Sequence, residues 1–222
     1  MPLFDLHRVW FVVLGYRMSG LEFLVTASNV LAVWLMTRKN VWTWPVGLAA
    51  TALFGLLSFE QRMYPDTLEQ VYYFATNCWG WWLWTRGAGE GPKSPLHPTY
   101  NRAGVNVLLA VVIAAATAAF GFVNAHVHIW WPAVFAHPAS FAYLDSFATA
   151  MSFVAQMLAA YMKMENWTLW MLVNAISAWM YWQRGVAFVS LLFVGFFLLA
   201  VKGWLNWRAD AKAAAAASAP SL

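Results

Sequence analysis

The sequence has little cysteine and little charge. A single cysteine among 222 residues excludes an internal disulfide framework, and it leaves no thiolate cluster to hold a metal. Only 10% of the residues are charged, whereas a soluble domain usually carries about 25%. The chain is instead 62% hydrophobic, with 16 tryptophans and a mean hydropathy of +0.57. This composition excludes an ordinary soluble domain and indicates a polytopic membrane protein.

Sequence signatures of common enzymes are also missing. The chain has no Walker A, GxSxG or HExxH motif. His126, His128 and His137 include an HxH pair, which is a possible metal-ligand spacing, but no carboxylate or cysteine lies near them. Histidines at a membrane interface are therefore the favoured interpretation. We expect no enzyme activity, no metal and no cofactor.

Seven sparsely charged runs are long enough to cross about 30 Å of hydrocarbon as helices. The short apolar run near the N-terminus lacks a cleavage pattern, which predicts an interfacial amphipathic helix over residues 5–18 and no cleavable signal peptide. The segment NAHVHIWWPAVFAHP predicts an interfacial loop, and the low-complexity tail from Ala209 is expected to be disordered or frayed. The seven expected spans are Leu21–Thr37, Val41–Phe59, Thr67–Thr85, Gly104–Val123, Phe141–Met162, Trp167–Gln183 and Val186–Leu205.

The distribution of lysine and arginine between the loops predicts the orientation. With the spans above, four of the 13 basic residues lie on the side of the N-terminus and nine lie on the other side. Because cytoplasmic loops carry the excess of Lys and Arg, we expect the N-terminus outside and the C-terminus in the cytoplasm. This bias also accounts for the net charge of +4 without a nucleic-acid partner.

Two parts of the sequence resemble each other. KNVWTWPVG resembles MENWTLWML, with Asn40 and Trp44 matching Asn166 and Trp170 at an offset of 126, and GWWLWTR resembles GWLNWR at an offset of 123. The repeat predicts two parallel triple-helix bundles joined by a linker helix (3+1+3), an arrangement known from transporters that bind ligands near the midplane. A merely structural duplication is the alternative. The expected segments are 1–20, 21–86, 87–140 (linker helix and extracellular loop), 141–208 and 209–222.

Polar side chains are set into the expected third and sixth spans. Steps of three and four place Gln70, Tyr73, Asn77, Trp81 and Trp84 on one helix face. The positions 123 residues later hold no amide, which favours an asymmetric ligand over amides that only join helices, although such joining is common in membranes. The sixth span adds the polar or aromatic residues Asn174, Ser177, Tyr181 and Trp182.

We expect these two groups to face each other across a central cavity. Rings beside amides suit a neutral, planar, polyhydroxylated ligand: the rings stack on its flat part, and the amides bond its hydroxyls or a carboxamide. The cores of the second, fourth, sixth and seventh spans hold no charged residue, and Glu69 near the outer end of the third span is ambiguous. The lack of a deep ionisable residue favours a facilitator over a proton- or sodium-coupled pump. Asn40 and Trp44 are candidates for a cytoplasmic gate.

Four motifs in order, WPVG, YPDTLEQVYY, GWWLW and ENWTLWMLVN, resemble those of the PnuC-type bacterial nicotinamide riboside transporters. Pro65 and Glu69 depart from the family pattern, which has Ala and Leu there. The resemblance implies a SWEET-like seven-helix fold, often trimeric, in the bacterial inner membrane. It also implies uptake of nicotinamide riboside, a vitamin B3 form used for NAD biosynthesis, by facilitated diffusion.

With such a ligand, each candidate residue has an expected role. Gln70 and Asn77 would hydrogen-bond the ligand, and Asn174 would complete the far side. Tyr73, Tyr181 and Trp182 would pack its ring and sugar, with cation–π attraction to the pyridinium of about 0.5–2 kcal/mol. The alternatives are a SWEET-like sugar facilitator, another nucleoside or vitamin facilitator, a channel, or a membrane enzyme.

Overall fold

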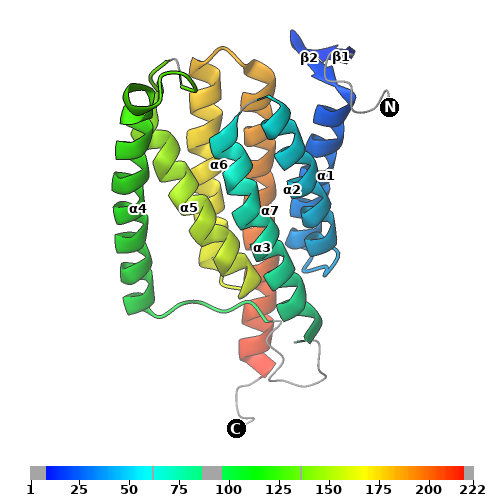
Figure 1. The fold of residues 1–222 in the computed structure, drawn as a ribbon. Coiled ribbons are helices and arrows are strands. Elements are labelled where there is room, and N and C mark those ends of the chain that lie inside the picture. Colours follow the sequence, from blue (N-terminus) through cyan, green and yellow to red (C-terminus); the bar gives the residue numbers. More distant parts are fainter. Residues whose placement is uncertain (1–8, 62, 87–96, 136, 218–222) are drawn as a thin grey trace.

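The structure is a computed structural model that describes residues 9–61, 63–86, 97–135 and 137–217. Within these ranges it contains one β-hairpin and seven α-helices, which run up and down beside one another (Figure 1). The strands are β1 (Val9–Val13) and β2 (Tyr16–Ser19). The helices are α1 (Gly20–Thr37), α2 (Thr43–Glu60), α3 (Tyr64–Arg86), α4 (Ala103–Trp130), α5 (Ala142–Ala160), α6 (Glu165–Gln183) and α7 (Ala187–Ala217).

The hairpin overturns the interfacial helix expected over residues 5–18, of which residues 5–8 lie outside the described ranges. β1 pairs antiparallel with β2, and Val13 lies opposite Tyr16. Leu14 and Gly15 both have positive φ, 51° and 80°, as the tight two-residue turn of a hairpin requires. The β-branched and aromatic residues of VWFVV favour a strand, and Gly15 supplies the left-handed turn that a helix cannot use.

Two helices are longer than expected. α4 continues to Trp130, so the first half of the segment expected as an interfacial loop is helical; no proline lies between Ala103 and Pro132. α7 continues to Ala217, so the tail expected to be frayed is helical over residues 209–217. Its alanines have the highest helix propensity of all residues, and the last five residues lie outside the described ranges.

Three helices are long and apolar enough to cross a membrane by length and composition: Gly20–Thr37, Ala103–Trp130 and Ala187–Ala213. The other four, α2, α3, α5 and α6, have 18 to 23 residues. They are therefore long enough to span about 30 Å, but they contain more of the polar residues. These four helices contribute most of the buried polar side chains described below.

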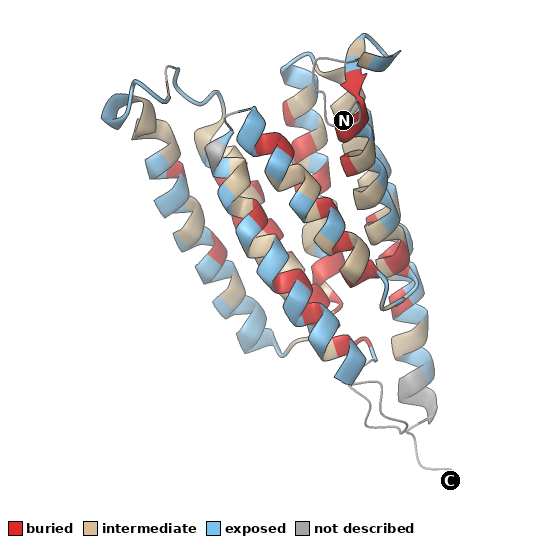
Figure 2. Cartoon of the chain, turned by 45° about the vertical axis from the view of Figure 1, so that its right-hand side comes forward, coloured by how far each residue is buried: buried red, intermediate tan, exposed pale blue. Residues whose placement is uncertain are grey.

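Six helices pack in a closed order. The packing contacts run from α1 to α2, α3, α5, α6 and α7, and α7 returns to α1. α4 packs on α5 outside this ring and stands apart at the left in Figure 1. Buried residues lie on the faces that the helices turn toward each other, while α4 is mostly exposed (Figure 2). A ring of six helices therefore surrounds the centre of the molecule.

Equivalent backbone hydrogen bonds recur at a constant spacing along the chain. The bonds that end α1 and α5, from Lys39 N to Met36 O and from Met162 N to Ala159 O, lie 123 residues apart. The same spacing relates the bonds that begin α2 and α6, and those that begin α3 and α7. Lys39 and Met162 even share a φ of 53°.

The spacing of 123 corrects the offset of 126 expected for the first part of the repeat. Trp44 corresponds to Trp167 and not to Trp170, because both indoles lie against a glycine of the next helix. A Cβ on Gly80 would lie 2.4 Å from Trp44, and a Cβ on Gly203 would lie 2.4 Å from Trp167. Because one spacing of 123 residues holds throughout, the loops that connect the helices do not differ in length between the two copies.

Four tryptophans close one end of the ring, which we call the tryptophan end; the opposite end carries the hairpin and is called the hairpin end. Trp44 meets Trp84 edge-on at 5.2 Å, and Trp167 meets Trp207 in the same way at 5.2 Å. Trp84 Nε1 donates to Ala160 O of α5, and Trp207 Nε1 donates to Met36 O of α1, both at 3.1 Å. Each half of the ring thus bonds to the other.

Replacement of glycines on α7 tests this packing. In Gly203→Ala the new methyl group would lie 2.4 Å from Trp167, so we expect a loss of about 1–3 kcal/mol of stability from overpacking. The matched change Gly195→Ala, on the same helix with nothing within 4 Å, should leave the melting temperature unchanged or slightly higher. Thermal unfolding of the purified protein in detergent measures both. Equal effects of the two changes would contradict the assigned contact.

Candidate functional site

The inner face of α3 carries two buried amides. Gln70 is 8% exposed and Asn77 is 5% exposed. Tyr73 lies between them and meets the ring of Phe153 on α5 edge-on at 5.7 Å. The buried face continues through Gly80 and Trp84, whereas Trp81 is 42% exposed, so the expectation that Trp81 shares this face is wrong.

Glycines of α2 make room for both amides. A Cβ on Gly47 would lie 2.7 Å from Asn77 Oδ1, and a Cβ on Gly55 would lie 3.4 Å from Gln70 Cβ. The Gln70 side chain is further held by its own helix, since Nε2 donates to Asp66 O at 3.3 Å. The two amides are therefore seated at the α2–α3 interface.

Asn77 also reaches the other half of the ring. Gln156 on α5 donates from Nε2 to Asn77 Oδ1 at 3.2 Å. The sequence-based prediction did not include Gln156. The signal was an amide set into the apolar run VAQML of the expected fifth span, whose polar residues were not compared with those of the third.

The inner face of α6 carries polar side chains that lack partners. Asn174 and Ser177 are 6% and 7% exposed, and neither side chain forms a hydrogen bond with another described residue. Neither is among the fully buried polar atoms left unpaired in the described chain. Their polar atoms therefore border space that a water-sized group can enter.

The aromatic residues at the end of α6 are placed differently from each other. Tyr181 stacks on Phe193 of α7 at 5.4 Å. Trp182 is 64% exposed. The structure brings Gln70, Tyr73 and Asn77 together on α3, but within the described chain no hydrogen bond or ring contact joins them to Asn174, Tyr181 or Trp182.

Charged side chains gather at the hairpin end. Arg184 forms an ion pair with Asp145 at 2.6 Å and lies over the Tyr181 ring at 5.4 Å from its centroid. Glu69 accepts a hydrogen bond from Thr149 Oγ1 at 3.0 Å, which joins α3 to α5. Asp66 lies one turn before Glu69 on α3, so this described cluster holds three carboxylates, those of Asp66, Glu69 and Asp145, and one guanidinium, that of Arg184.

The two residues expected at a gate have different surroundings. Trp44 is fully buried in the tryptophan end, and its Nε1 is one of the buried atoms without a hydrogen-bond partner. Asn40 is exposed in the α1–α2 loop, where Oδ1 accepts from Trp42 N at 3.0 Å. Asn40 thus shapes the start of α2, whereas Trp44 is packed within the tryptophan end.

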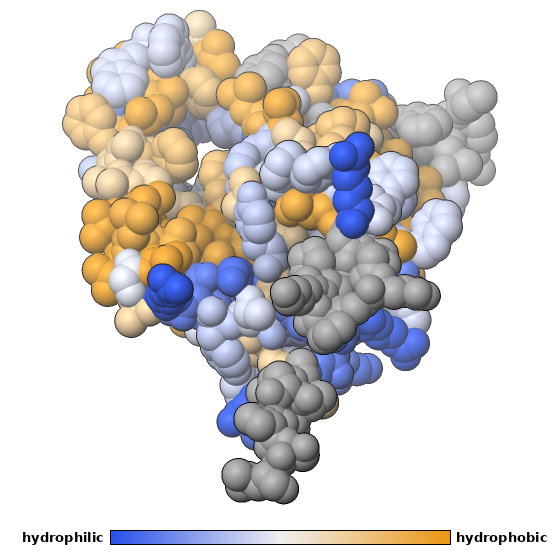
Figure 3. Space-filling model, turned by 90° about the horizontal axis from the view of Figure 1, so that it is seen from below, coloured by the Kyte–Doolittle hydropathy of each residue, from blue (hydrophilic) through white to orange (hydrophobic). Residues whose placement is uncertain are grey.

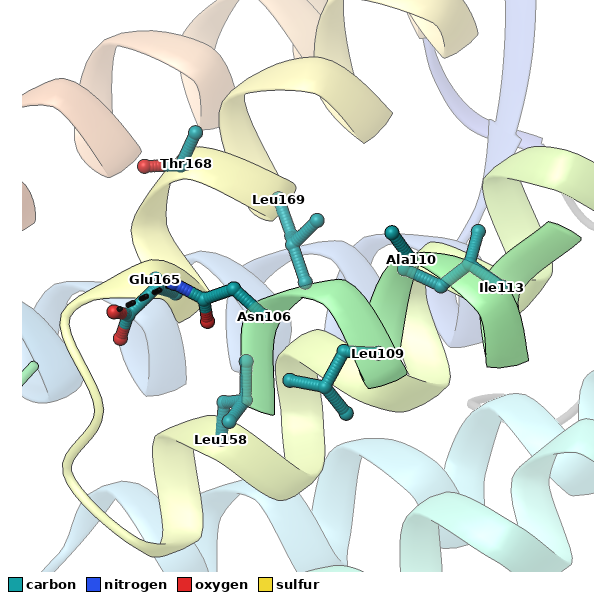
Figure 4. A pocket seen from close by; sticks show the side chains of 8 residues that line it. All are labelled: Asn106, Leu109, Ala110, Ile113, Leu158, Glu165, Thr168 and Leu169. Carbon is teal, nitrogen blue, oxygen red and sulfur yellow. Dashed lines mark hydrogen bonds between the residues drawn. The ribbon is translucent and has the colours of Figure 1, made fainter. Parts of the chain in front are cut away.

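Two cavities formed by described residues lie outside the ring. One of about 210 Å³ is bordered by α4, α5 and α6 and includes Asn106, Glu165 and Thr168 in its lining (Figure 4). Glu165 Oε1 accepts from Asn101 N at 2.8 Å and from Asn106 Nδ2 at 3.5 Å. None of the candidate residues line this cavity, which opens beside α4.

The buried interior of the described chain has polar side chains but no charged ones. Serine, threonine, asparagine and glutamine make up its buried polar residues. A ligand inside the ring of helices would therefore meet amides, hydroxyls and aromatic rings.

Seen from the tryptophan end, hydrophilic side chains gather at the surface, and the side formed by α4 is hydrophobic (Figure 3).

Comparison with known proteins places the chain among transporters of vitamins and their derivatives. Residues 19–209 match the profile of the nicotinamide mononucleotide transporter family. The nicotinamide riboside transporter PnuC of Escherichia coli strain K12 is 26% identical over 209 residues, covering 86% of this chain and 87% of that protein. The riboflavin/roseoflavin transporter RibM of Streptomyces davaonensis is 27% identical over 222 residues, covering 95% and 92%.

A solved structure has a similar fold. The crystal structure of the vitamin B3 transporter PnuC superposes with a TM-score of 0.65 at 19% sequence identity, covering 87% of this chain and 82% of that one. At this identity the likeness concerns the fold.

The contact between Gly47 and Asn77 can be tested by substitution. Gly47→Ala would place a methyl group 2.7 Å from Asn77 Oδ1, and we expect it to lower the stability by about 1–3 kcal/mol. Gly55→Ala, whose methyl group would only touch Gln70 Cβ at 3.4 Å, should have a smaller effect. In an Asn77→Ala background the Gly47 substitution should lose most of its effect. Melting curves in detergent that show the same penalty in both backgrounds would contradict the contact.

Proposed function

The chain belongs to the nicotinamide mononucleotide transporter family, and from that premise we propose that it carries nicotinamide riboside across the bacterial inner membrane. Like its relatives, it is a membrane transporter and not an enzyme. The substrate proposal rests on the similarity to PnuC proteins and on the chemistry of the buried side chains. We propose that this uptake supplies a precursor for NAD biosynthesis.

The observation that carries the choice of substrate is the buried interior with amides and without charge. A phosphate monoester brings a charge of about −1.5 to −2 at neutral pH, and such a charge is expensive to bury without a cationic partner. No Lys or Arg is buried in the described chain, and the described cluster of Asp66, Glu69, Asp145 and Arg184 at the hairpin end holds more carboxylates than cations. The site therefore favours the riboside, whose pyridinium is cationic, over the mononucleotide.

We propose a ligand site at the centre of the ring. Gln70 and Asn77 hydrogen-bond the ligand from α3, and Asn174 does so from α6. Tyr73 and Tyr181 pack its ring and sugar. The exposure of Trp182 (64%) argues against direct contact in this conformation.

The transport path follows from the same arrangement. We propose two parallel triple-helix bundles, α1–α3 and α5–α7, with α4 as linker, which is supported by the constant spacing of their backbone bonds. The tryptophan end is the cytoplasmic gate, with Trp44 in it, so the N-terminus lies outside. No Asp, Glu, Lys or Arg is among the buried residues of the described chain, which supports facilitated diffusion. A homotrimer is proposed on family resemblance.

Riboflavin is the second candidate, because RibM is about as similar in sequence as PnuC. Its ring system is flat and uncharged, and its imide edge also pairs with amides. The charge of the ligand separates the two candidates: carboxylates at the hairpin end attract a pyridinium but are indifferent to a flavin.

A titration of the purified protein distinguishes the candidates. We expect calorimetry to show saturable binding of nicotinamide riboside and affinities at least about tenfold weaker for nicotinamide mononucleotide, since the phosphate finds no buried cation. Riboflavin should also bind more weakly. Tighter binding of riboflavin would replace the proposed substrate, and binding of neither vitamin would refute the proposal.

Uptake by variants tests the site. In liposomes loaded with a nicotinamide riboside kinase and ATP, Gln70→Ala and Asn77→Ala should each reduce uptake of radiolabelled nicotinamide riboside about tenfold or more, because a hydrogen bond to the ligand is lost. Trp182→Ala serves as the control and should transport at a rate near that of the wild type. If both amide variants bind and transport normally, the site lies elsewhere.

A further inference from the structure

Gln156 lies on α5, in the half of the ring of helices opposite Asn77. It is half-buried, and its side chain donates from Nε2 to Asn77 Oδ1 at 3.2 Å. An amide within an apolar helix is costly unless its groups are satisfied, and this single bond satisfies one of them. The contact also spans the two halves, since α3 and α5 meet there.

The direction of this bond fixes what the pair can offer to a ligand. Asn77 uses its carbonyl oxygen, which leaves the Nδ2 hydrogens free to donate. Gln156 uses an N–H, which leaves Oε1 free to accept. Asn77 Nδ2 and Gln156 Oε1 have no partner among the described residues, and neither is among the fully buried unpaired atoms of the described chain. Both therefore border space that a small polar group can enter.

Asn77 is not free to turn away from this arrangement. Its amide lies against the backbone of α2, where a Cβ on Gly47 would be 2.7 Å from Oδ1 and 3.3 Å from Nδ2. The side chain is thus confined between α2 and Gln156. A confined donor beside a free acceptor forms a preorganised pair, which loses little entropy when a ligand binds.

We propose that Gln156 and Asn77 together recognise the primary carboxamide of the substrate, with Asn77 Nδ2 donating to the carboxamide oxygen and Gln156 Oε1 accepting from the carboxamide NH2. This assignment rests on the proposed function, because it names the part of nicotinamide riboside that the pair reads. Each of the three amides then donates one hydrogen bond and accepts one. Gln156 is both a ligand contact and the residue that positions Asn77.

The assignment predicts which analogues are rejected. A carboxylate in place of the carboxamide offers acceptors only, so it would face Gln156 Oε1 without a hydrogen. A methyl ketone keeps the oxygen but has no N–H, so it leaves Oε1 unpaired. A site built to hydrogen-bond a group discriminates strongly against a ligand that lacks it. If Gln156 only joined α3 to α5, its substitution would weaken the binding of all ligands alike.

The test compares two ligands of equal charge, nicotinamide riboside and 3-acetylpyridine riboside, which differ by NH2 and CH3. Calorimetry on the wild-type protein in detergent should give a Kd about tenfold or more higher for the acetyl analogue, because a polar acceptor is left unmatched. Gln156→Met removes the acceptor at similar size, so the ratio of the two Kd values should fall to within about threefold of one.

A second variant and a control separate the two roles of Gln156. Gln156→Glu keeps an acceptor but cannot donate to Asn77 Oδ1 when ionised. Both ligands should then bind more weakly, while the preference for the carboxamide remains. Gln183→Met changes an exposed glutamine at the end of α6, and both Kd values should stay at the wild-type level. Melting curves of all variants report folding.

The outcomes are distinct. If the Met variant keeps the wild-type ratio while the wild type binds nicotinamide riboside, the carboxamide assignment is wrong and the proposed function stands. If the Met variant does not fold, loss of the preference in the Glu variant overturns the assignment and retention supports it. If the wild type binds neither riboside, the proposed function fails and the assignment fails with it.

Discussion

The two indole hydrogen bonds that cross between the halves are the constraint from which the rest of the arrangement follows. The carbonyl groups in the last turn of a helix lack partners within it, and inside a membrane protein they must find others. Trp84 bonds Ala160 O near the end of α5, and Trp207 bonds Met36 O near the end of α1, each at 3.1 Å. Met36 O also accepts the backbone bond from Lys39 N that ends α1, so the indole bonds add to these helix ends and join each of them to the other half.

These bonds also make the two ends of the ring unequal. At the tryptophan end the halves meet through buried rings whose approach depends on Gly80 and Gly203. At the hairpin end they meet through the stack of Tyr16 on Phe188 at 5.4 Å and the bond from Thr149 to Glu69. Fewer apolar groups must separate at the hairpin end, so opening there requires less loss of buried surface. This difference fits a state that is closed at the tryptophan end.

The sequence predicts the helices better than their ends. Seven helices were expected from apolar runs, because hydrophobic length is a strong local signal. The hairpin at Val9–Ser19 was missed because its turn, with Leu14 at positive φ, is not evident from composition. The helical tail after Ala209 was missed because a low-complexity sequence was interpreted as disorder, although alanine favours helix.

The candidate site was predictable only where it follows from one helix. The helical period places Gln70, Tyr73 and Asn77 on one face of α3. The repeat spacing of 123 residues, which is evident from the sequence, identifies the corresponding positions on α7. The partnership of Asn77 with Gln156 depends on how α3 meets α5, and no local pattern encodes that contact. The repeat was misaligned at Trp44 because tryptophan is abundant, and the recurring backbone bonds together with the glycine against each indole identify Trp167 as its counterpart.

The scaffold is duplicated, but its polar interior is not. Positions 123 residues from Asn77 and Gln156 hold Ala200 and Val33, and the position corresponding to Gln70 holds Phe193. Amides that served only to join helices would be equally useful in both copies, since the backbone bonds recur in both. An interior that is amide-rich on one side and apolar on the other matches a ligand with a polar edge and an apolar face. A nicotinamide ring is such a ligand, which is why the asymmetry points to recognition of a substrate by these amides.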